Sequence, residues 1–310
     1  QVAQAILGRP VAEDALILGI SGRYEFKNKG IDVFIDAMGQ LNRNNGLGKE
    51  VLAFILVPAG HAGANKELLH NLELPYQAVT STDLYLTHYL NDSANDPVMN
   101  RIRAQKLRNS EEDKVKIFFV PSYLNGDDGV LNMPYYDLLV GMDLTAFPSY
   151  YEPWGYTPLE SLAFKVPTIT TTLAGFGLWV KEHYNMNHPG IEVIHREDGD
   201  ASNVATAIAE WVKNYQQVGE TEMQKDRDNA KDVSRIALWD NLINYYKQAY
   251  TIALNQVSVR LKDLPANMNE SVSYIEKQLT VNNPSWVSVM IHRSIPEKLI
   301  ALEELSKNLW

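Results

Sequence analysis

Short apolar runs alternate with longer amphipathic segments along the first 200 residues of the chain. A strand buried in a parallel sheet reads as a continuous apolar run, whereas apolar residues three and four positions apart indicate a helix. This alternation is typical of repeated βα units over a parallel sheet. The pattern predicts strands at 15–21, 51–58, 114–121, 143–149, 166–172 and 191–195, and helices at about 31–41, 134–141 and 158–164.

From Asp200 onward the pattern becomes helical, with apolar residues at helical spacing in VATAIAEWV and LWDNLINYYKQAYTIAL. Pro, Asn and acidic residues then interrupt it in KDLPANMNES. We therefore expect an α/β domain at residues 1–260, a parallel sheet flanked by helices with a helical C-terminal region, followed by a linker at 261–290. Because the chain opens without Met and stops within a helical pattern, we expect it to be a piece of a longer protein.

Composition narrows the possible partners. The 310 residues are 45% hydrophobic, which is enough for a large core. Twenty-eight Lys and Arg against 38 Asp and Glu give a net charge of −10, which argues against nucleic acid or an anionic membrane as a partner. Cysteine is absent, which excludes disulfides, a thiol nucleophile and thiolate metal sites. With no signal-like start and no membrane-spanning apolar run, we expect a cytoplasmic protein.

The loop after the first predicted strand, SGRYEFKNKG (21–30), is rich in cations. It places Arg23, Lys27 and Lys29 just before a helix N-terminus, where the helix dipole disfavours positive charge. A bound anion between the cations and the free helix amides would explain them, and a solvated basic turn is the alternative. Ligands of doubly wound sheets bind at the carboxyl ends of strands, so this loop is a candidate phosphate site. It holds no G-x-G-x-x-G, so a nicotinamide cofactor is not predicted.

A second candidate loop lies in YYEPWGYTPLESLAF (150–164). Thr157, followed by a proline and by Glu160, has the spacing of a capping box that starts a helix. The first-turn amides beside Gly155 would then form a nest that binds phosphate. Glu152 precedes a proline in an extended or turn conformation and cannot serve that helix. It is therefore a candidate partner for sugar hydroxyls, with an ordinary surface charge as the alternative.

Other candidate motifs are weaker. NGDDG (125–129) contains an acidic pair, but its flanking glycines indicate a turn. The seven histidines lack the spacing of metal ligands, so we expect no metal site. Ser21 and Ser149 have no recognisable His and Asp partners, so a hydrolase triad has no support.

Three segments in order, SGRYEFKNKGIDVFIDA, FPSYYEPWGYTPLES and PTITTTLAGFG, resemble the C-terminal half of glycogen synthases of the glycosyltransferase family 3 type. The resemblance runs from about residue 5 to 255. It implies the nucleotide-sugar domain, Rossmann-like, of a GT-B enzyme, whose N-terminal domain would belong to the same parent chain. The implied reaction is retaining transfer of glucose from UDP-glucose to the non-reducing end of an α-1,4-glucan, with no metal or other cofactor.

The resemblance also implies roles for charged residues. Arg23 and Lys29 would hold the donor pyrophosphate and offset the charge of departing UDP. Glu152 and Glu160 match the two acids of the family's E-x7-E pattern. Glu152 would contact the transferred glucose, and Glu160 would hold the ribose hydroxyls.

The remaining donor contacts implied by the resemblance come from backbone amides and an aromatic ring. The amides around Gly155, Tyr156 and Thr157 would receive the phosphates at the helix N-terminus. Tyr135 occupies the position of a tyrosine that stacks on uracil, and its neighbour Tyr136 is the alternative if the register differs by one.

The chain departs from the family in two respects. Members from animals and fungi carry a run of arginines that senses glucose 6-phosphate, whereas TEMQKDRDNAKDVSR (221–235) mixes acids with few basic residues. We therefore expect no strong activation by glucose 6-phosphate. The chain also lacks the N-terminal domain that supplies much of the acceptor site, so we expect it to be inactive alone.

The tail IHRSIPEKLIALEELSKNLW (291–310) is similar to the opening of bacterial α-glucan phosphorylases. An ordinary amphipathic helix is the alternative, because its leucines lie at helical spacing. The resemblance implies a parent protein that joins a synthase to a phosphorylase module.

Two other functions stay open at this point. The phosphate-binding residues do not distinguish bases, so an ADP-glucose-dependent glucan synthase is one alternative. A non-catalytic nucleotide- or glucan-binding scaffold is the other, although a scaffold has no need for Arg23, Lys29, Glu152 and Glu160 together.

Overall fold

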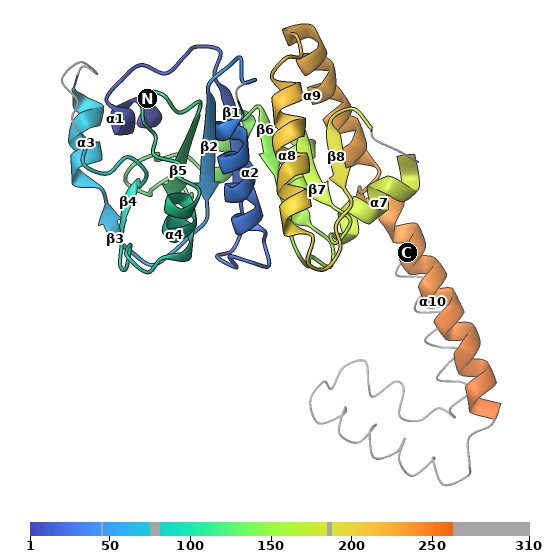
Figure 1. The fold of residues 1–310 in the computed structure, drawn as a ribbon. Helices are drawn as coiled ribbons and strands as arrows, with labels where there is room; N and C mark the ends of the chain where they lie inside the picture. The colour runs from blue at the N-terminus through green and yellow to red at the C-terminus, as the bar shows by residue number, and fades with distance from the viewer. Residues whose placement is uncertain (45, 75–80, 185–187, 263–310) are drawn as a thin grey trace, which may run out of the picture. The chain divides into compact units, whose positions relative to one another are not determined.

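A computed structural model describes residues 1–44, 46–74, 81–184 and 188–262 of the chain (Figure 1). The chain divides into two compact units, Gln1–Ala237 and Leu238–Trp310. The described part of the second unit is the helix α10, Trp239–Lys262. Nearly all of the predicted linker, and all of the predicted phosphorylase-like tail at 291–310, lie outside the described residues. None of the described helices combines the length and apolar character needed to cross a membrane.

The first unit is built on a six-stranded parallel sheet in the order β5-β2-β1-β6-β7-β8. The chain builds outward from β1 to one edge, then returns and builds outward from β6 to the other edge. This is the order of a doubly wound, Rossmann-like sheet, and it confirms the predicted fold. All six predicted strands are present, as β1 (Leu16–Ser21), β2 (Val51–Leu56), β5 (Val115–Val120), β6 (Leu144–Ala146), β7 (Thr168–Thr171) and β8 (Ile191–Ile194).

Helices cover both faces of this sheet. On one face, α2 (Ile31–Arg43) and α8 (Ala201–Tyr215) lie side by side over the central strands (Figure 1). Leu18 and Ile20 of β1 belong to the core beneath them, whereas Ile17 packs into clusters on the opposite face, as the alternation of strand side chains requires. That opposite face is covered by α5 (Tyr135–Val140), α6 (Tyr156–Ala163), α7 (Gly175–Tyr184) and α9 (Glu220–Arg235).

Some elements have no counterpart among the predictions. A small antiparallel pair, β3 (His61–Ala64) with β4 (His88–Leu90), interrupts the βα series. The segment HAGA of β3 has no alternation of apolar and polar residues, so periodicity could not reveal it. The additional helices are α1 (Val2–Leu7), α3 (Lys66–Glu73), α4 (Pro97–Ala104) and α7 (Gly175–Tyr184).

The start of α6 differs from the predicted capping box. The helix begins at Tyr156, its N-cap is Gly155 with φ 112°, and no side chain caps it. Thr157 is therefore already the second helical residue, and Glu160 lies beyond the first turn. The prediction was wrong because Gly155, which tolerates positive φ, turns the chain two residues earlier than a threonine cap would. Among the residues that the structure describes, no side chain caps the N-terminal amides of α6.

The loops that follow β1 and β6 approach each other closely at Gly30. This residue has φ 69°, and a Cβ atom placed on it would lie 1.8 Å from the carbonyl oxygen of Pro148. Gly30 precedes α2, which follows β1, and Pro148 follows β6. The loops at the carboxyl ends of β1 and β6 can therefore touch only because this position is glycine.

We expect Gly30→Ala to lower the free energy of unfolding by about 2 kcal/mol or more, because the methyl group meets backbone and the backbone is left-handed. Gly48→Ala is the matched control, since nothing lies within 4 Å of its added Cβ. We expect that control to change stability by less than about 0.5 kcal/mol. Urea denaturation followed by near-UV circular dichroism measures both, and equal midpoints for the two variants would contradict the contact.

We expect Thr157→Ala to change the free energy of unfolding by less than about 0.5 kcal/mol, because its hydroxyl does not cap α6. Asn65 is a true N-cap, since its side chain accepts hydrogen bonds from the amides of Glu67 and Leu68 at the start of α3. Asn65→Ala should cost about 1 kcal/mol or more. The same denaturation experiment compares the two, and a larger loss for Thr157→Ala would restore the capping box.

Candidate functional site

The loop after β1 (21–30) and the loop after β6 (147–155) lie side by side where the strand order reverses. Their backbones are joined directly, because the amide of Tyr150 donates a hydrogen bond of 2.8 Å to the carbonyl of Asn28. Doubly wound sheets bind ligands in the crevice at this point. The two loops that the sequence singled out are thus brought to one place, although more than a hundred residues separate them in the chain.

Lys29 and Glu152 form an ion pair across these two loops, with Lys29 Nζ donating to Glu152 Oε2. Their side chains are 16% and 20% exposed, so the pair is partly withdrawn from water but still accessible to a ligand. Reduced solvent screening strengthens the field of such charges. The meeting point of the loops 21–30 and 147–155, called the crevice below, therefore holds one ammonium group beside one carboxylate.

The backbone of Glu152 is held by the loop after β7. Its amide donates to the carbonyl of Leu173 at 3.3 Å, and its carbonyl accepts from the amide of Gly175 at 3.0 Å. A Cβ atom on Gly175 would lie 2.1 Å from the carbonyl oxygen of Pro153, so only glycine allows this approach. The motif PTITTTLAGFG thereby contributes to the site by fixing the position of Glu152.

Trp154 anchors the same segment through its ring. Its centroid lies 5.8 Å from that of Phe176 and 5.9 Å from that of Trp179, both in edge-on geometry. Neighbouring Tyr151 is instead 62% exposed. Glu152 therefore lies between a packed aromatic residue and one that faces solvent.

Glu160 is not engaged in helix capping. Its Oε1 accepts a hydrogen bond of 3.1 Å from the hydroxyl of Tyr136. The ring of Tyr136 stacks on that of Phe164, with centroids 4.9 Å apart and planes within 11°. Phe164 was not singled out in the sequence, and its place one turn after Glu160 on α6 is the signal that could have found it.

The two neighbouring tyrosines differ in their surroundings. The hydroxyl of Tyr135 lies 2.7 Å from Ser21 Oγ, at the end of β1, and burial raises the pKa of Tyr135 to about 12. Tyr136 is 43% exposed, and partial burial and the nearby Glu160 carboxylate raise its pKa as well. Tyr135 is thus tied to the end of β1 and Tyr136 to α6, and Tyr136 is the more open to solvent.

The cations of the first loop are separated in the structure. Arg23 is 78% exposed and lies 2.9 Å from Glu25 of its own loop. Lys27 pairs at 2.7 Å with Asp32 in the first turn of α2, which offsets its unfavourable place near the helix N-terminus. Of these three cations, only Lys29 is paired with Glu152 across the crevice.

The weaker motifs have structural roles. The segment at 125–129 is a turn, as predicted, in which the carboxylate of Asp128 accepts from the amides of Val130, Leu131 and Asn132. His183 and His188 each place a ring nitrogen against a backbone carbonyl. Within the described ranges, no three His, Asp or Glu side chains are grouped so that they could hold a metal ion.

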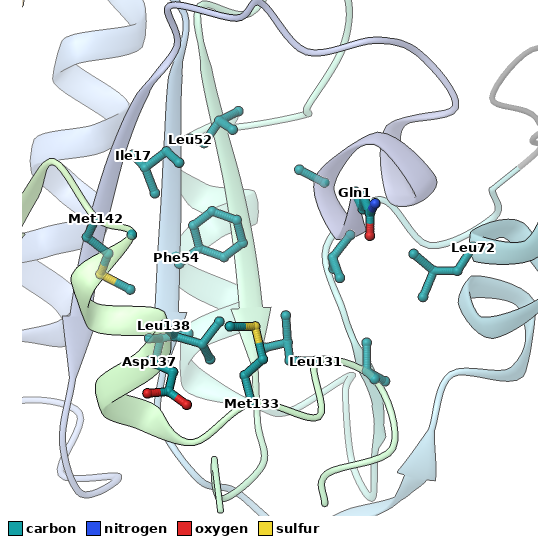
Figure 2. A pocket seen from close by; sticks show the side chains of 15 residues that line it. Gln1, Ile17, Leu52, Phe54, Leu72, Leu131, Met133, Asp137, Leu138 and Met142 are labelled. Carbon is teal, nitrogen blue, oxygen red and sulfur yellow. The ribbon is translucent and has the colours of Figure 1, made fainter. Parts of the chain in front are cut away.

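An apolar cavity of about 620 Å³ lies apart from the crevice, against the sheet between α1 and α5 (Figure 2). Ile17, Leu52 and Phe54 of β1 and β2 form one wall, and Leu138 and Met142 face them. Asp137 is the one charged residue among its lining. This cavity therefore lacks the charge that a phosphate or a sugar hydroxyl array requires.

Comparison with solved structures gives matches with low scores. The N-terminal domain of trehalose-6-phosphate phosphatase from Candida albicans gives a TM-score of 0.48 at 12% identity, covering 80% of this chain and 43% of that one. HepE of Anabaena in complex with UDP and glucose gives 0.41 at 16% identity, covering 77% and 48%. Both scores lie below 0.5, so the fold rests on the strand order described above.

Sequence comparison gives closer relatives. Glycogen [starch] synthase isoform 2 of Saccharomyces cerevisiae is 28% identical over 307 residues, covering 79% of this chain and 44% of the relative. The liver glycogen [starch] synthase of Rattus norvegicus is 27% identical over 295 residues, covering 79% and 42%. The chain thus spans less than half the length of these curated relatives. The family model described as glycogen synthase matches residues 11–82 and 78–297, which is most of the chain, and the chain therefore belongs to the glycogen synthase family.

Proposed function

We propose that this chain is the nucleotide-sugar-binding part of a glycogen (starch) synthase that transfers glucose from UDP-glucose to the non-reducing end of an α-1,4-glucan with retention of configuration. The observation that carries the proposal is the Lys29–Glu152 pair across the crevice where the strand order reverses. A cation for phosphate and an anion for sugar hydroxyls stand there side by side. The names of the relatives supply the substrate class.

Lys29 and Arg23 bind the donor pyrophosphate in this proposal. When the glycosidic bond to UDP breaks, negative charge grows on the leaving phosphate, and preorganised cations stabilise that charge. Lys29 is preorganised by its contact with Glu152, whereas Arg23 is on the surface and has to leave its partner Glu25 to turn toward the ligand. Because Lys29 and Arg23 supply positive charge for the phosphates, we propose that the transfer uses neither a metal ion nor another cofactor.

The N-terminus of α6 receives the phosphates. It begins after Gly155 without a side-chain cap, so the amides around Gly155, Tyr156 and Thr157 are available to an anion. Glu160, which serves no cap, binds the ribose hydroxyls together with its partner Tyr136.

The base and the sugar occupy the two sides of this phosphate site. Uracil stacks on Tyr135, or on the more exposed Tyr136, beside the crevice. Glu152 accepts hydrogen bonds from the transferred glucose and orients its anomeric carbon, because its backbone is held from both sides by the loop after β7.

The whole protein, in this proposal, is a cytoplasmic two-domain GT-B enzyme. The chain spans less than half of its curated relatives, and the rest of the parent protein supplies an N-terminal domain and most of the acceptor site. The described chain alone should therefore bind donor weakly and transfer no glucose. The phosphorylase-like module stays a prediction from residues 291–310, outside the described residues.

Calorimetric titration of the chain with UDP, ADP and UDP-glucose tests the donor assignment. We expect binding of UDP and UDP-glucose and weaker binding of ADP. Lys29→Ala should weaken UDP binding at least about tenfold, because it removes a charge-assisted contact to phosphate.

Lys27→Ala is the matched control, since Lys27 lies two residues away and pairs with Asp32. We expect it to change UDP affinity by less than about threefold, in line with a surface ion pair. Preference for ADP would overturn the donor assignment. Absence of binding to any nucleotide would favour the scaffold function, and equal losses for Lys27→Ala and Lys29→Ala would remove Lys29 from the site.

Glucose 6-phosphate should neither bind this chain tightly nor activate the longer protein strongly. Three of the four basic residues of α9 are already paired with carboxylates, since Arg227 pairs with Asp143 at 2.8 Å and Lys225 with Glu222 at 2.9 Å. Arg235 likewise pairs with Asp232 at 3.0 Å. Titration with glucose 6-phosphate should show no saturable heat below millimolar concentration, and a large activation of the longer protein would contradict the expectation.

A further inference from the structure

Arg196, just after β8, is a buried arginine behind the crevice. The residue is only 6% exposed to solvent. Its backbone is fixed to the loop after β7, because its amide donates to Thr172 Oγ1 at 3.0 Å and its carbonyl accepts from the same hydroxyl at 3.3 Å. This fixed backbone places the guanidinium group against the loop after β6.

Two residues of that loop, Pro148 and Tyr150, contact the guanidinium group. Arg196 Nη1 donates to the carbonyl oxygen of Pro148, and the guanidinium carbon lies 5.4 Å from the ring centroid of Tyr150. The hydroxyl of Tyr150 donates to Asp198 Oδ1 at 2.5 Å. The segment after β8 thus holds Tyr150 at both ends of its side chain, two residues before Glu152.

The Pro148 carbonyl is also the group that touches Gly30. Its oxygen accepts from the guanidinium group and also lies against the backbone of Gly30. Gly30 directly follows Lys29. The contact that Arg196 makes is therefore the one that spaces the loop bearing Lys29 from the loop bearing Glu152.

Burying Arg196 lowers the stability of the folded state. Its Nε and Asp32 Oδ1 are both buried without a hydrogen-bond partner in the described part of the chain, and burial lowers the pKa of Arg196. A buried charge with incomplete hydrogen bonding destabilises the folded state. Such local costs are expected where a residue serves a site rather than the stability of the core.

We propose that Arg196 is a positioning residue that sets the separation between Lys29 and Glu152 by holding the Pro148 carbonyl and the Tyr150 ring. The geometric part of this proposal stands on the contacts above, and its consequence for ligand binding rests on the proposed function. Arg196 itself touches neither the sugar nor the phosphates. It acts through the backbone of the loop after β6.

Hydrogen exchange of single amides in the 310-residue chain tests the geometric part without any ligand. The reporters are the amide of Tyr150, bonded to Asn28, and the amide of Glu152, bonded to Leu173. In Arg196→Ala we expect both to exchange at least about tenfold faster, while amides of β1 and β7 keep their protection. Arg196→Lys keeps the charge but loses the planar guanidinium group, so its exchange rates should fall between those of the unsubstituted chain and those of Arg196→Ala. It is the variant to use if Arg196→Ala does not fold.

Arg101→Ala is the matched control, because Arg101 is an arginine that ties α4 to α2 through Asp36. It should leave the exchange of the Tyr150 and Glu152 amides unchanged. If these two amides stay protected in both Arg196 variants, the positioning role is overturned. Equal loosening in Arg101→Ala would also overturn it, since the effect would then be a general loss of stability.

Titration of the same variants with UDP tests the consequence. We expect Arg196→Ala to weaken UDP binding at least about tenfold, since small displacements of a binding group have large effects, and Arg101→Ala to leave it unchanged. Loosened amides with unaltered UDP affinity would overturn the link between Arg196 and the site. If the amides exchange faster in the Arg196 variants but the unsubstituted chain binds no nucleotide, the positioning role is supported. The proposed function is then refuted separately.

Discussion

The close approach of Gly30 to the Pro148 carbonyl is the contact on which the rest of the site depends. The parallel sheet can bring the carboxyl ends of β1 and β6 to one edge, but side chains normally keep the loops that follow them apart. A glycine in left-handed conformation removes that obstacle. Lys29 and Glu152 then come within reach of each other, and the backbone of Tyr150 bonds to that of Asn28. One missing methyl group thus determines whether two loops form one crevice.

Around this contact the chain leaves groups unpaired where a stable core would pair them. The helix α6 begins at a glycine with no side-chain cap, and Arg196 is buried with one nitrogen lacking a partner among the described residues. By contrast, Asn65 caps α3, and Arg227 and Lys225 of α9 are paired with carboxylates. Local costs of this kind are expected where residues serve a binding site.

The charged residues of the chain also differ in their surroundings. The net charge of −10 excludes a general attraction for polyanions, so affinity for phosphate has to come from local arrangement. Lys27 is paired with Asp32 at the start of α2, whereas Lys29 is paired with Glu152 of the loop after β6. Two lysines in one short loop therefore have different partners, and their spacing in the sequence does not say which is which.

The sequence by itself determined the six strands of the sheet, the two loops that meet at its edge, and the family, because continuous apolar runs and short motifs are local properties of the chain. It missed the β3–β4 pair, which has no periodic pattern, and it placed the start of α6 at Thr157, because a capping motif cannot reveal that Gly155 has turned the chain already. Only the tertiary structure decided that Lys29 meets Glu152, that Glu160 meets Tyr136, and that Arg196 lies behind them. Those contacts join residues from different βα units, and their distances are set by how the sheet twists and packs, which no local pattern encodes.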